Sequence, residues 1–274
     1  MKPTKTLVST GIAWALALSP LVLADDDDSD SDEHEVPFEV AEVFFELNNT
    51  DGDLGIHALV DGGPWKRLTI EDTRDRKILN VYARGRLRRQ GLTEIFFESA
   101  EPQFDELPPE EFFERFPEGT YDVEGRTLDG AELESETEIT HAMPAPPAAM
   151  VNGLSMALQC DDEEPGYDAP TLSAPIVVSW PAVTTTHPGL GDPQDSTDIS
   201  IINYEVVVEA EIDGLDGEEF VTVFSVVLPP DVTSMTVPEE FLSQTDEFKF
   251  EVLAREESWN QTAVESCFLL DDDD

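Results

Sequence analysis

Short runs of apolar residues that alternate with polar ones recur at regular intervals in the second half of the chain. Alternation with a period of two places the apolar side chains on one face of a β-strand. Six such runs follow Pro175, at residues 176–180, 201–212, 220–227, 233–237, 248–254 and 263–269. With a first strand at 154–160, this spacing predicts a seven-stranded β-sandwich.

The first half carries similar but less regular signals. Runs rich in β-branched and aromatic residues lie at 38–47, 54–60, 78–83 and 93–98, bounded by Asp-Gly, Gly-Gly and Arg-Gln-Gly breaks. The segment 108–116 starts with Pro-Pro-Glu-Glu and places Phe112, Phe113 and Phe116 on one side, which predicts a short helix. Residues 121–126 and 132–140 predict a hairpin. We therefore expect an all-β sandwich with one short helix.

A stretch rich in proline and alanine at 143–150 divides the two halves. We interpret it as a linker between an N-terminal domain at 36–142 and a C-terminal domain at 151–270. Acidic segments at 25–35 and 271–274 cannot bury apolar surface, so we expect them to be disordered.

The C-terminal half resembles a fibronectin type III domain at several positions. The family's second-strand tryptophan matches Trp180, its third-strand tyrosine matches Tyr204, and the leucine before its sixth strand matches Leu242. The sixth strand itself matches 248–254, although Phe248 stands where the family has a corner tyrosine. In the N-terminal half, the stretch from Phe116 to Tyr121 resembles the final hairpin of immunoglobulin-like bacterial domains. These resemblances imply two β-sandwich domains, the first immunoglobulin-like and the second fibronectin type III-like.

The first 24 residues have the pattern of a secretory signal peptide. Lys2 and Lys5 precede an apolar stretch at 7–18, and Pro20 and Ala24 follow in the pattern of a cleavage site. The stretch is short for a membrane helix, and no later segment approaches the required length. We therefore expect the mature chain to be secreted or periplasmic, without a transmembrane segment.

The charge balance limits the partners. The chain has 61 acidic and 15 basic residues and a formal net charge of −46. Cleavage after Ala24 removes two basic residues and no acidic one, which leaves −48. This charge excludes general affinity for nucleic acid or anionic membranes, and it predicts a protein that is more stable in salt.

Two cysteines, Cys160 and Cys267, are present. In an exported chain they predict one disulfide, with a buried pair of free thiols as the alternative. In the fibronectin type III resemblance, the ends of the first and last strands lie side by side, which implies a Cys160–Cys267 bridge between them.

The segment 48–55 alternates oxygen-bearing side chains with glycines. Asn49, Asp51 and Asp53 could supply hard oxygen ligands to calcium, although the pattern lacks the glycine and glutamate of an EF-hand loop. The alternative is a plain Asp-Gly turn between two strands. Calcium is the single cofactor candidate.

Nine of the 13 mature basic residues lie between Lys66 and Arg89. This set includes Arg84, Arg86, Arg88 and Arg89, which predict a docking face for an acidic partner, such as an anionic polysaccharide or the chain's own tails. The alternative is that these arginines pair with carboxylates on the same sheet.

The sequence contains no motif that predicts catalysis. Its four histidines are far apart, and it has no nucleophile elbow, phosphate-binding glycine loop or zinc motif. We therefore expect a non-enzymatic binding or adhesion protein that presents sandwich loops to an extracellular protein or polysaccharide. The alternative is a calcium-dependent structural or cell-surface protein.

Overall fold

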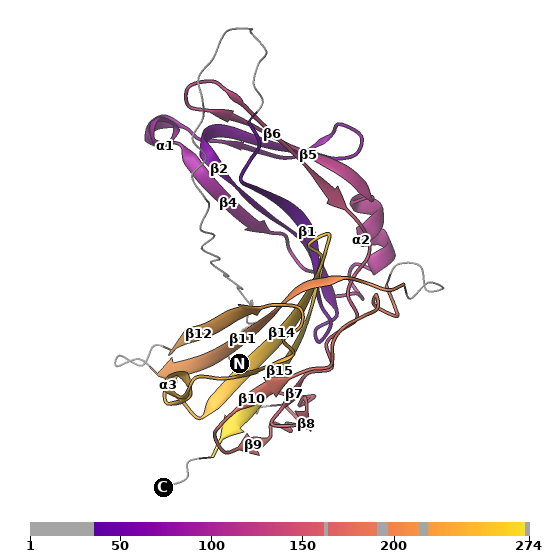
Figure 1. Cartoon of the computed structure of the whole chain (residues 1–274), viewed down its shortest axis with the longest axis vertical. Helices are drawn as coiled ribbons and strands as arrows, with labels where there is room; N and C mark the ends of the chain where they lie inside the picture. Colours follow the sequence, from indigo (N-terminus) through magenta and orange to yellow (C-terminus); the bar gives the residue numbers. More distant parts are fainter. Residues whose placement is uncertain (1–35, 162–163, 191–196, 214–218, 272–274) are drawn as a thin grey trace. The chain divides into compact units, whose positions relative to one another are not determined.

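A computed structural model describes residues 36–161, 164–190, 197–213 and 219–271 of the chain (Figure 1). The predicted signal peptide, the acidic segment at 25–35 and residues 272–274 of the acidic tail lie outside the described residues. Within these ranges, no helix is long and apolar enough to cross a membrane. The described chain consists mainly of β-strands, which confirms the all-β prediction.

The first half of the described chain contains six strands and two short helices. The strands are β1 (Val40–Asn48), β2 (Asp53–Glu71), β3 (Lys77–Tyr82), β4 (Leu92–Glu98), β5 (Gly119–Thr127) and β6 (Glu132–Ile139). The helices are α1 (Gly85–Gln90) and α2 (Pro109–Arg115). The predicted strands, the hairpin and the helix at α2 are confirmed, whereas α1 lies in a segment for which the sequence pattern predicts no helix.

The strand β2 runs through 19 residues, including the Gly62-Gly63 pair that predicts a break. Its first part pairs with β1 and β4, and its last part pairs with β3 and β5. The pairing with β4 shifts register between Asp61 and Trp65, so the glycines accommodate an irregularity and do not end the strand. Gly62 also leaves room for Phe38, since a Cβ there would lie 3.0 Å from the Phe38 ring. The predicted break is therefore wrong.

Aromatic side chains attach α2 to β1. The ring of Phe45 lies 5.3 Å from the ring of Phe112 and 5.7 Å from that of Phe113, measured between centroids. All three side chains are buried. The helix begins at Pro109, where a missing N–H has no consequence, and it ends before Pro117. Its predicted apolar side therefore faces the core of the first half.

The second half forms two β-sheet layers. Its strands are β7 (Met150–Val151), β8 (Leu154–Ser155), β9 (Thr171–Leu172), β10 (Val177–Ser179), β11 (Ile201–Asp213), β12 (Glu219–Leu228), β13 (Ser234–Thr236), β14 (Glu247–Glu256) and β15 (Gln261–Leu270), with a helical turn α3 (Glu239–Leu242). One layer has the order β13-β10-β7-β8, and the other runs β12-β11-β14-β15 (Figure 1). Buried side chains from both layers share one core, which confirms a sandwich.

The residues that suggested the fibronectin type III resemblance all lie in this core. Trp180 is buried 5.2 Å from Tyr204 between ring centroids, and Leu242 is buried as well. Phe248, which has no hydroxyl, stacks on Phe268 at 5.1 Å between centroids. Aromatic stacking therefore occupies the position where a corner tyrosine would make a hydrogen bond.

The Cys160–Cys267 disulfide is present, as predicted, with the two Cα atoms 5.7 Å apart. The strand expected at 154–160 is not continuous, because only Leu154–Ser155 is extended and paired. Asn152 and Gly153 both have positive φ, which closes a tight hairpin between β7 and β8. The chain then reaches Cys160 through a loop, in which the Ala157 N–H donates to Ser266 Oγ at 2.8 Å.

The two halves share a sheet, because β1 pairs in parallel with β15. Within the described residues, eleven strands belong to this sheet, whose main path is β12-β11-β14-β15-β1-β2-β5-β6. The segment expected to be a linker contacts both its neighbours: Met143 is buried, and the Thr262 hydroxyl donates to the Pro144 carbonyl oxygen at 2.8 Å. The domain boundary at 143–150 stays a prediction.

Candidate functional site

A row of side chains crosses three strands at the far end of β2. Arg67 of β2 lies opposite Tyr82 of β3 on one side and opposite Arg126 of β5 on the other. The Arg67 guanidinium carbon lies 5.5 Å from the centroid of the Tyr82 ring, in a cation–π contact. Directly paired positions in antiparallel strands bring side chains together, so this register gathers two cations and an aromatic ring on one patch.

The helix α1 borders this patch because it begins just after β3. The Ala83 N–H donates to the Lys66 carbonyl oxygen at 3.0 Å, which holds the end of β3 against β2. Gly85 and Gly91, at the two ends of the helix, both have positive φ, a conformation that glycine adopts without strain. None of the helical side chains is buried. The cationic side chains of α1 are therefore available to solvent.

A pocket of about 480 Å³ lies between the helix and the strands. We call it the basic pocket and define it by Lys66, Arg67, Tyr82, Arg84, Arg88 and Arg126, which line it. Two of the four predicted partner-binding arginines thus line the pocket. These two are Arg84, the N-cap residue of α1, and Arg88 within the helix, whereas Arg86 and Arg89 of α1 do not line the pocket.

The arginines in and next to α1 lack carboxylate partners. We call Arg84, Arg86, Arg88 and Arg89 the basic face; within the described residues, none of them has an ion pair at 4.0 Å or less. Pairing with the sheet, the alternative expectation, holds for Arg76 with Asp72 and for Lys77 with Glu71 instead. In addition, Arg67 Nε is buried without a hydrogen-bond partner among the described residues.

The segment 48–55, predicted to bind calcium, forms a turn between β1 and β2. Asn48 Oδ1 accepts from the Thr50 and Asp51 N–H groups at 3.0 and 3.2 Å, as in an Asx turn. Asn49 Oδ1 lies 3.0 Å from His187 Nε2, so its oxygen faces that ring. The described residues contain no group of three or more His, Cys, Asp or Glu side chains placed to hold a metal ion. Metal binding by this loop stays a prediction.

Asp53 is the exceptional member of this loop. Its Oδ1 is buried and receives no hydrogen bond from the described residues. Burial, followed by repulsion from Glu101, Asp51 and Glu265, raises the pKa of Asp53 to about 7. The loop therefore places a carboxyl group where a proton or a cation would stabilise it.

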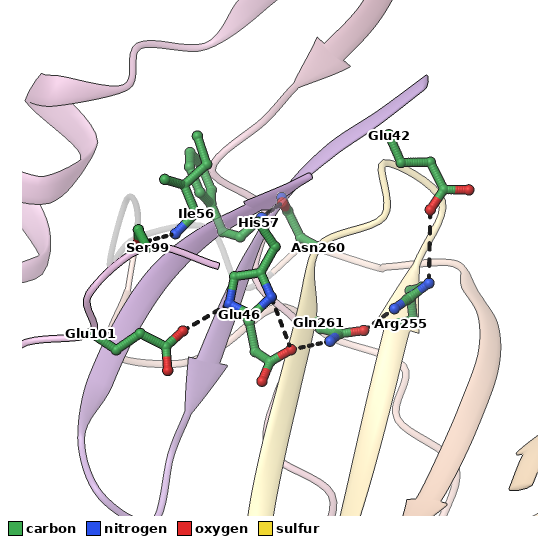
Figure 2. A network of polar contacts seen from close by, with 10 residues as sticks. Glu42, Glu46, Ile56, His57, Ser99, Glu101, Arg255, Asn260 and Gln261 are labelled. Carbon is green, nitrogen blue, oxygen red and sulfur yellow. Dashed lines mark hydrogen bonds and ion pairs between the residues drawn. The ribbon is translucent and has the colours of Figure 1, made fainter. Parts of the chain in front are cut away.

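A polar network around the buried side chains of His57 and Gln261 joins β1 and β2 to β14 and β15 (Figure 2). His57 Nε2 lies 2.8 Å from Glu101 Oε1, and His57 Nδ1 lies 3.7 Å from Glu46 Oε2. Gln261 donates to Glu46, and Arg255 Nε donates to Gln261 Oε1 at 2.7 Å. We call these five residues the junction network. Because His57 is only 3% exposed, its two carboxylate neighbours stabilise a charge that water does not reach.

Asn260 adds a second connection at the same place. Its Oδ1 accepts from the Phe45 N–H at 2.8 Å, and its Nδ2 donates to the Thr140 carbonyl oxygen at 2.9 Å. The side chain is completely buried. One amide thus satisfies backbone groups of β1 and of the segment that follows β6.

Neither the pocket nor the junction network was identifiable from local sequence patterns. Lys66, Arg67, Tyr82 and Arg126 come from three strands, and only their register brings them together. The one local signal was the density of basic residues between Lys66 and Arg89. For His57, the alternation of β2 indicates a strand but does not reveal which residues cover its outer face.

Comparisons with known proteins do not assign the chain to a family. No protein-family model matches the chain, and no curated protein matches it. Among solved structures, the chain is similar to a tetra-tandem repeat in the extending region of a large adhesion protein, with 13% identity and a TM-score of 0.24. It is also similar to a 1.5-MDa bacterial ice-binding adhesin, at 14% and 0.22, and to the BSP domain of a biofilm-associated protein, at 11% and 0.23.

These three matches cover 85%, 87% and 85% of this chain but only 50%, 66% and 30% of the matched chains. The chain thus spans less than two thirds of each of them. TM-scores this low do not establish a shared fold.

Proposed function

We propose that the chain is a secreted, non-enzymatic binding or adhesion protein whose basic face docks an anionic extracellular partner. The supporting observation is that Arg84, Arg86, Arg88 and Arg89 lack ion pairs within the described residues of a chain with 61 acidic residues. Like charges three and four residues apart on a helix repel each other. An anionic partner relieves this repulsion and gains charge-assisted hydrogen bonds from the planar guanidinium groups.

An extracellular location is part of the proposal. The disulfide between Cys160 and Cys267 favours an oxidising compartment, and the predicted signal peptide agrees with it. The fibronectin type III resemblance also stays a proposal. It is supported by the two layers β7-β10-β13 and β12-β11-β14-β15. The chain crosses between these layers several times, so each layer combines strands from different parts of this half.

The proposal is tested by retention of the mature protein on alginate and heparin columns. We expect retention that decreases with salt and that is lost in the double variant Arg86→Ala/Arg88→Ala. The matched control is Arg74→Ala/Arg115→Ala, which removes the same charge from an exposed turn and from α2, where Arg115 pairs with Glu111. Equal retention of the two double variants would contradict a docking role for the basic face.

A second candidate function is calcium-dependent structural stabilisation. It is favoured by Asp53, whose buried Oδ1 has no hydrogen-bond partner among the described residues and whose pKa is raised to about 7, by burial first and by neighbouring carboxylates next. Calorimetry at about 1 mM calcium, compared between the native chain and Asp53→Asn, tests it. Heat of binding that disappears in the variant supports this function, and no heat in the native chain excludes it.

A further inference from the structure

We infer that the basic pocket binds one acidic sugar residue, a pyranose ring that carries a carboxylate or a sulfate. This inference rests on the proposed function and specifies its partner as an anionic glycan. The basic face supplies general attraction, whereas the pocket supplies shape and a defined set of donors. The two contributions can therefore be separated by changing residues that belong to one and not to the other.

The pocket's charge favours a single localised anion. Lys66 and Arg67 come from β2, Arg84 from the start of α1 and Arg88 from its last turn, and none has an ion pair within the described residues. Arg126 is the exception, because it pairs with Glu132. Donors that converge from several elements onto one space are typical of sites that bind carboxylate or sulfate oxygens.

Arg67 provides the second indication of a ligand. Its Nε is buried and has no acceptor among the described residues, although a buried donor is nearly always paired in native proteins. Its backbone position, between Tyr82 and Arg126, holds the guanidinium at the pocket wall. An oxygen of a bound anion would supply the missing acceptor, either directly or through a water.

Tyr82 favours a sugar over an acidic peptide. Its side chain is 54% exposed at the pocket, with the Arg67 guanidinium over the ring. An exposed tyrosine combines an apolar ring with a polar hydroxyl, which suits a ligand that has both C–H faces and hydroxyl groups. The volume of about 480 Å³ lies within the usual range for small-ligand pockets. A glutamate side chain offers the charge but no ring to lie against Tyr82.

The test is calorimetry on the mature chain with four probes. Two are acidic sugars: a hexuronate tetrasaccharide, and a sulfated tetrasaccharide built from otherwise neutral sugar units. The other two are the same tetrasaccharide without sulfates, called the neutral sugar, and a tetraglutamate peptide. Arg88→Ala and Arg89→Ala form a matched pair, since both remove one charge from the last turn of α1 but only Arg88 lines the pocket. We expect Arg88→Ala to weaken binding of an acidic sugar about tenfold or more, because it removes a charged hydrogen-bond donor. Arg89→Ala should weaken it less than about threefold.

Tyr82→Ser separates sugar from peptide. It should weaken the acidic sugar by about threefold to tenfold and leave tetraglutamate unchanged. Which of the two acidic sugars binds more tightly identifies the anionic group.

Equal losses in Arg88→Ala and Arg89→Ala would overturn the pocket as a binding site while leaving the basic face as a docking surface. Binding of tetraglutamate at least as tight as that of either sugar, or of the neutral sugar equal to the acidic ones, would overturn the sugar assignment. Absence of binding to any anionic probe or polymer would overturn the proposed function as well.

Discussion

Two regions of the molecule hold charged side chains in opposite ways. On α1 the basic face is exposed, and its cations have no carboxylate partners among the described residues. Where β1 meets β15, carboxylates are only partly exposed and lie beside a few donors, namely His57, Gln261 and Arg255. The first region carries charge that is free to bind, and the second carries charge that must be neutralised within the fold.

Solvation explains the difference. Exposed guanidinium groups keep their hydration and contribute little to stability in either direction. Partly buried carboxylates lose hydration, so burial raises the pKa of Glu46, Glu251 and Glu265 above the usual range. Neighbouring carboxylates add to this rise at Glu251 and Glu265, whereas His57 and Gln261 oppose it at Glu46. Glu251 and Glu265 even lie directly opposite each other in the β14–β15 pair. Substitutions should therefore affect folding strongly at the junction and weakly on the basic face.

The largest effect is expected at His57. Replacing it with glutamine leaves Glu46 and Glu101, whose side chains are 21% and 23% exposed, beside a neutral group. This should reduce the free energy of unfolding by about 3 kcal/mol, because the lost partner is buried but the carboxylates keep some hydration. Chemical denaturation measures this loss. His187→Gln is the matched control, because His187 is only partly buried and contacts the neutral Asn49. Similar small losses in both variants would show that His57 does not stabilise the carboxylates of the junction.

The next effect concerns a neutral member of the same region. Asn260→Ala removes the acceptor of the Phe45 N–H and the donor to the Thr140 carbonyl oxygen, both in buried surroundings. We expect a loss of about 1–3 kcal/mol in the free energy of unfolding. Faster amide exchange of Phe45 locates the effect. Gln244→Ala, at an exposed position, should change stability by less than about 0.5 kcal/mol.

Local sequence patterns predicted the strands on both sides of this comparison but not the contacts between them. The alternation in 248–254 and 263–269 is local, so it predicts β14 and β15 without knowledge of their neighbours. The parallel pairing of β15 with β1 joins residues more than two hundred positions apart, and no local pattern encodes it. His57 is buried against Phe44 of β1 and Phe96 of β4, and no local pattern encodes these contacts either.

At two places where the structure differs from the sequence-based expectation, the local sequence does carry a signal. Asn152-Gly153 is a common hairpin pair, and it predicts the turn between β7 and β8, which leaves only Leu154–Ser155 of the strand expected at 154–160. In α1, Leu87 and the arginines around it have good helix propensity, but the segment has no apolar stripe because no face of it is buried. A helix with no buried face has no apolar periodicity, so that periodicity cannot predict it.

A smaller effect should depend on pH at the edge of the junction. The pKa of Asp53 is raised to about 7 by burial and by nearby carboxylates, whereas an unfolded chain titrates near the ordinary value of about 3.9. The folded state thus binds the proton more tightly, and stability is lost as the pH rises between these values. Asp53→Asn should stabilise the protein by about 1 kcal/mol at about pH 8, since water screens this partly buried group, and should have no effect near pH 4.

Denaturation curves for Asp53→Asn at both pH values provide the measurement. The control is Asp75→Asn, in an exposed turn where Asp75 has positive φ and asparagine is equally tolerated. That variant should change stability by less than about 0.5 kcal/mol at either pH. A gain for Asp53→Asn that is equal at both pH values would mean that the carboxyl group is not protonated in the folded state at low pH.

The smallest effect is expected on the basic face. Arg86→Gln/Arg89→Gln removes two exposed charges that have no ion pairs within the described residues. Relief of repulsion within α1 and loss of the favourable interaction of Arg89 with the carboxyl end of the helix oppose each other, so the net change should stay within about 0.5 kcal/mol. Urea denaturation measures this change, and polyanion binding by the same variant should fall.

A loss above about 1 kcal/mol would instead mean that these arginines stabilise the fold, because exposed substitutions without a structural role rarely cost that much. Their exposure would then no longer distinguish them from the buried charges at the junction.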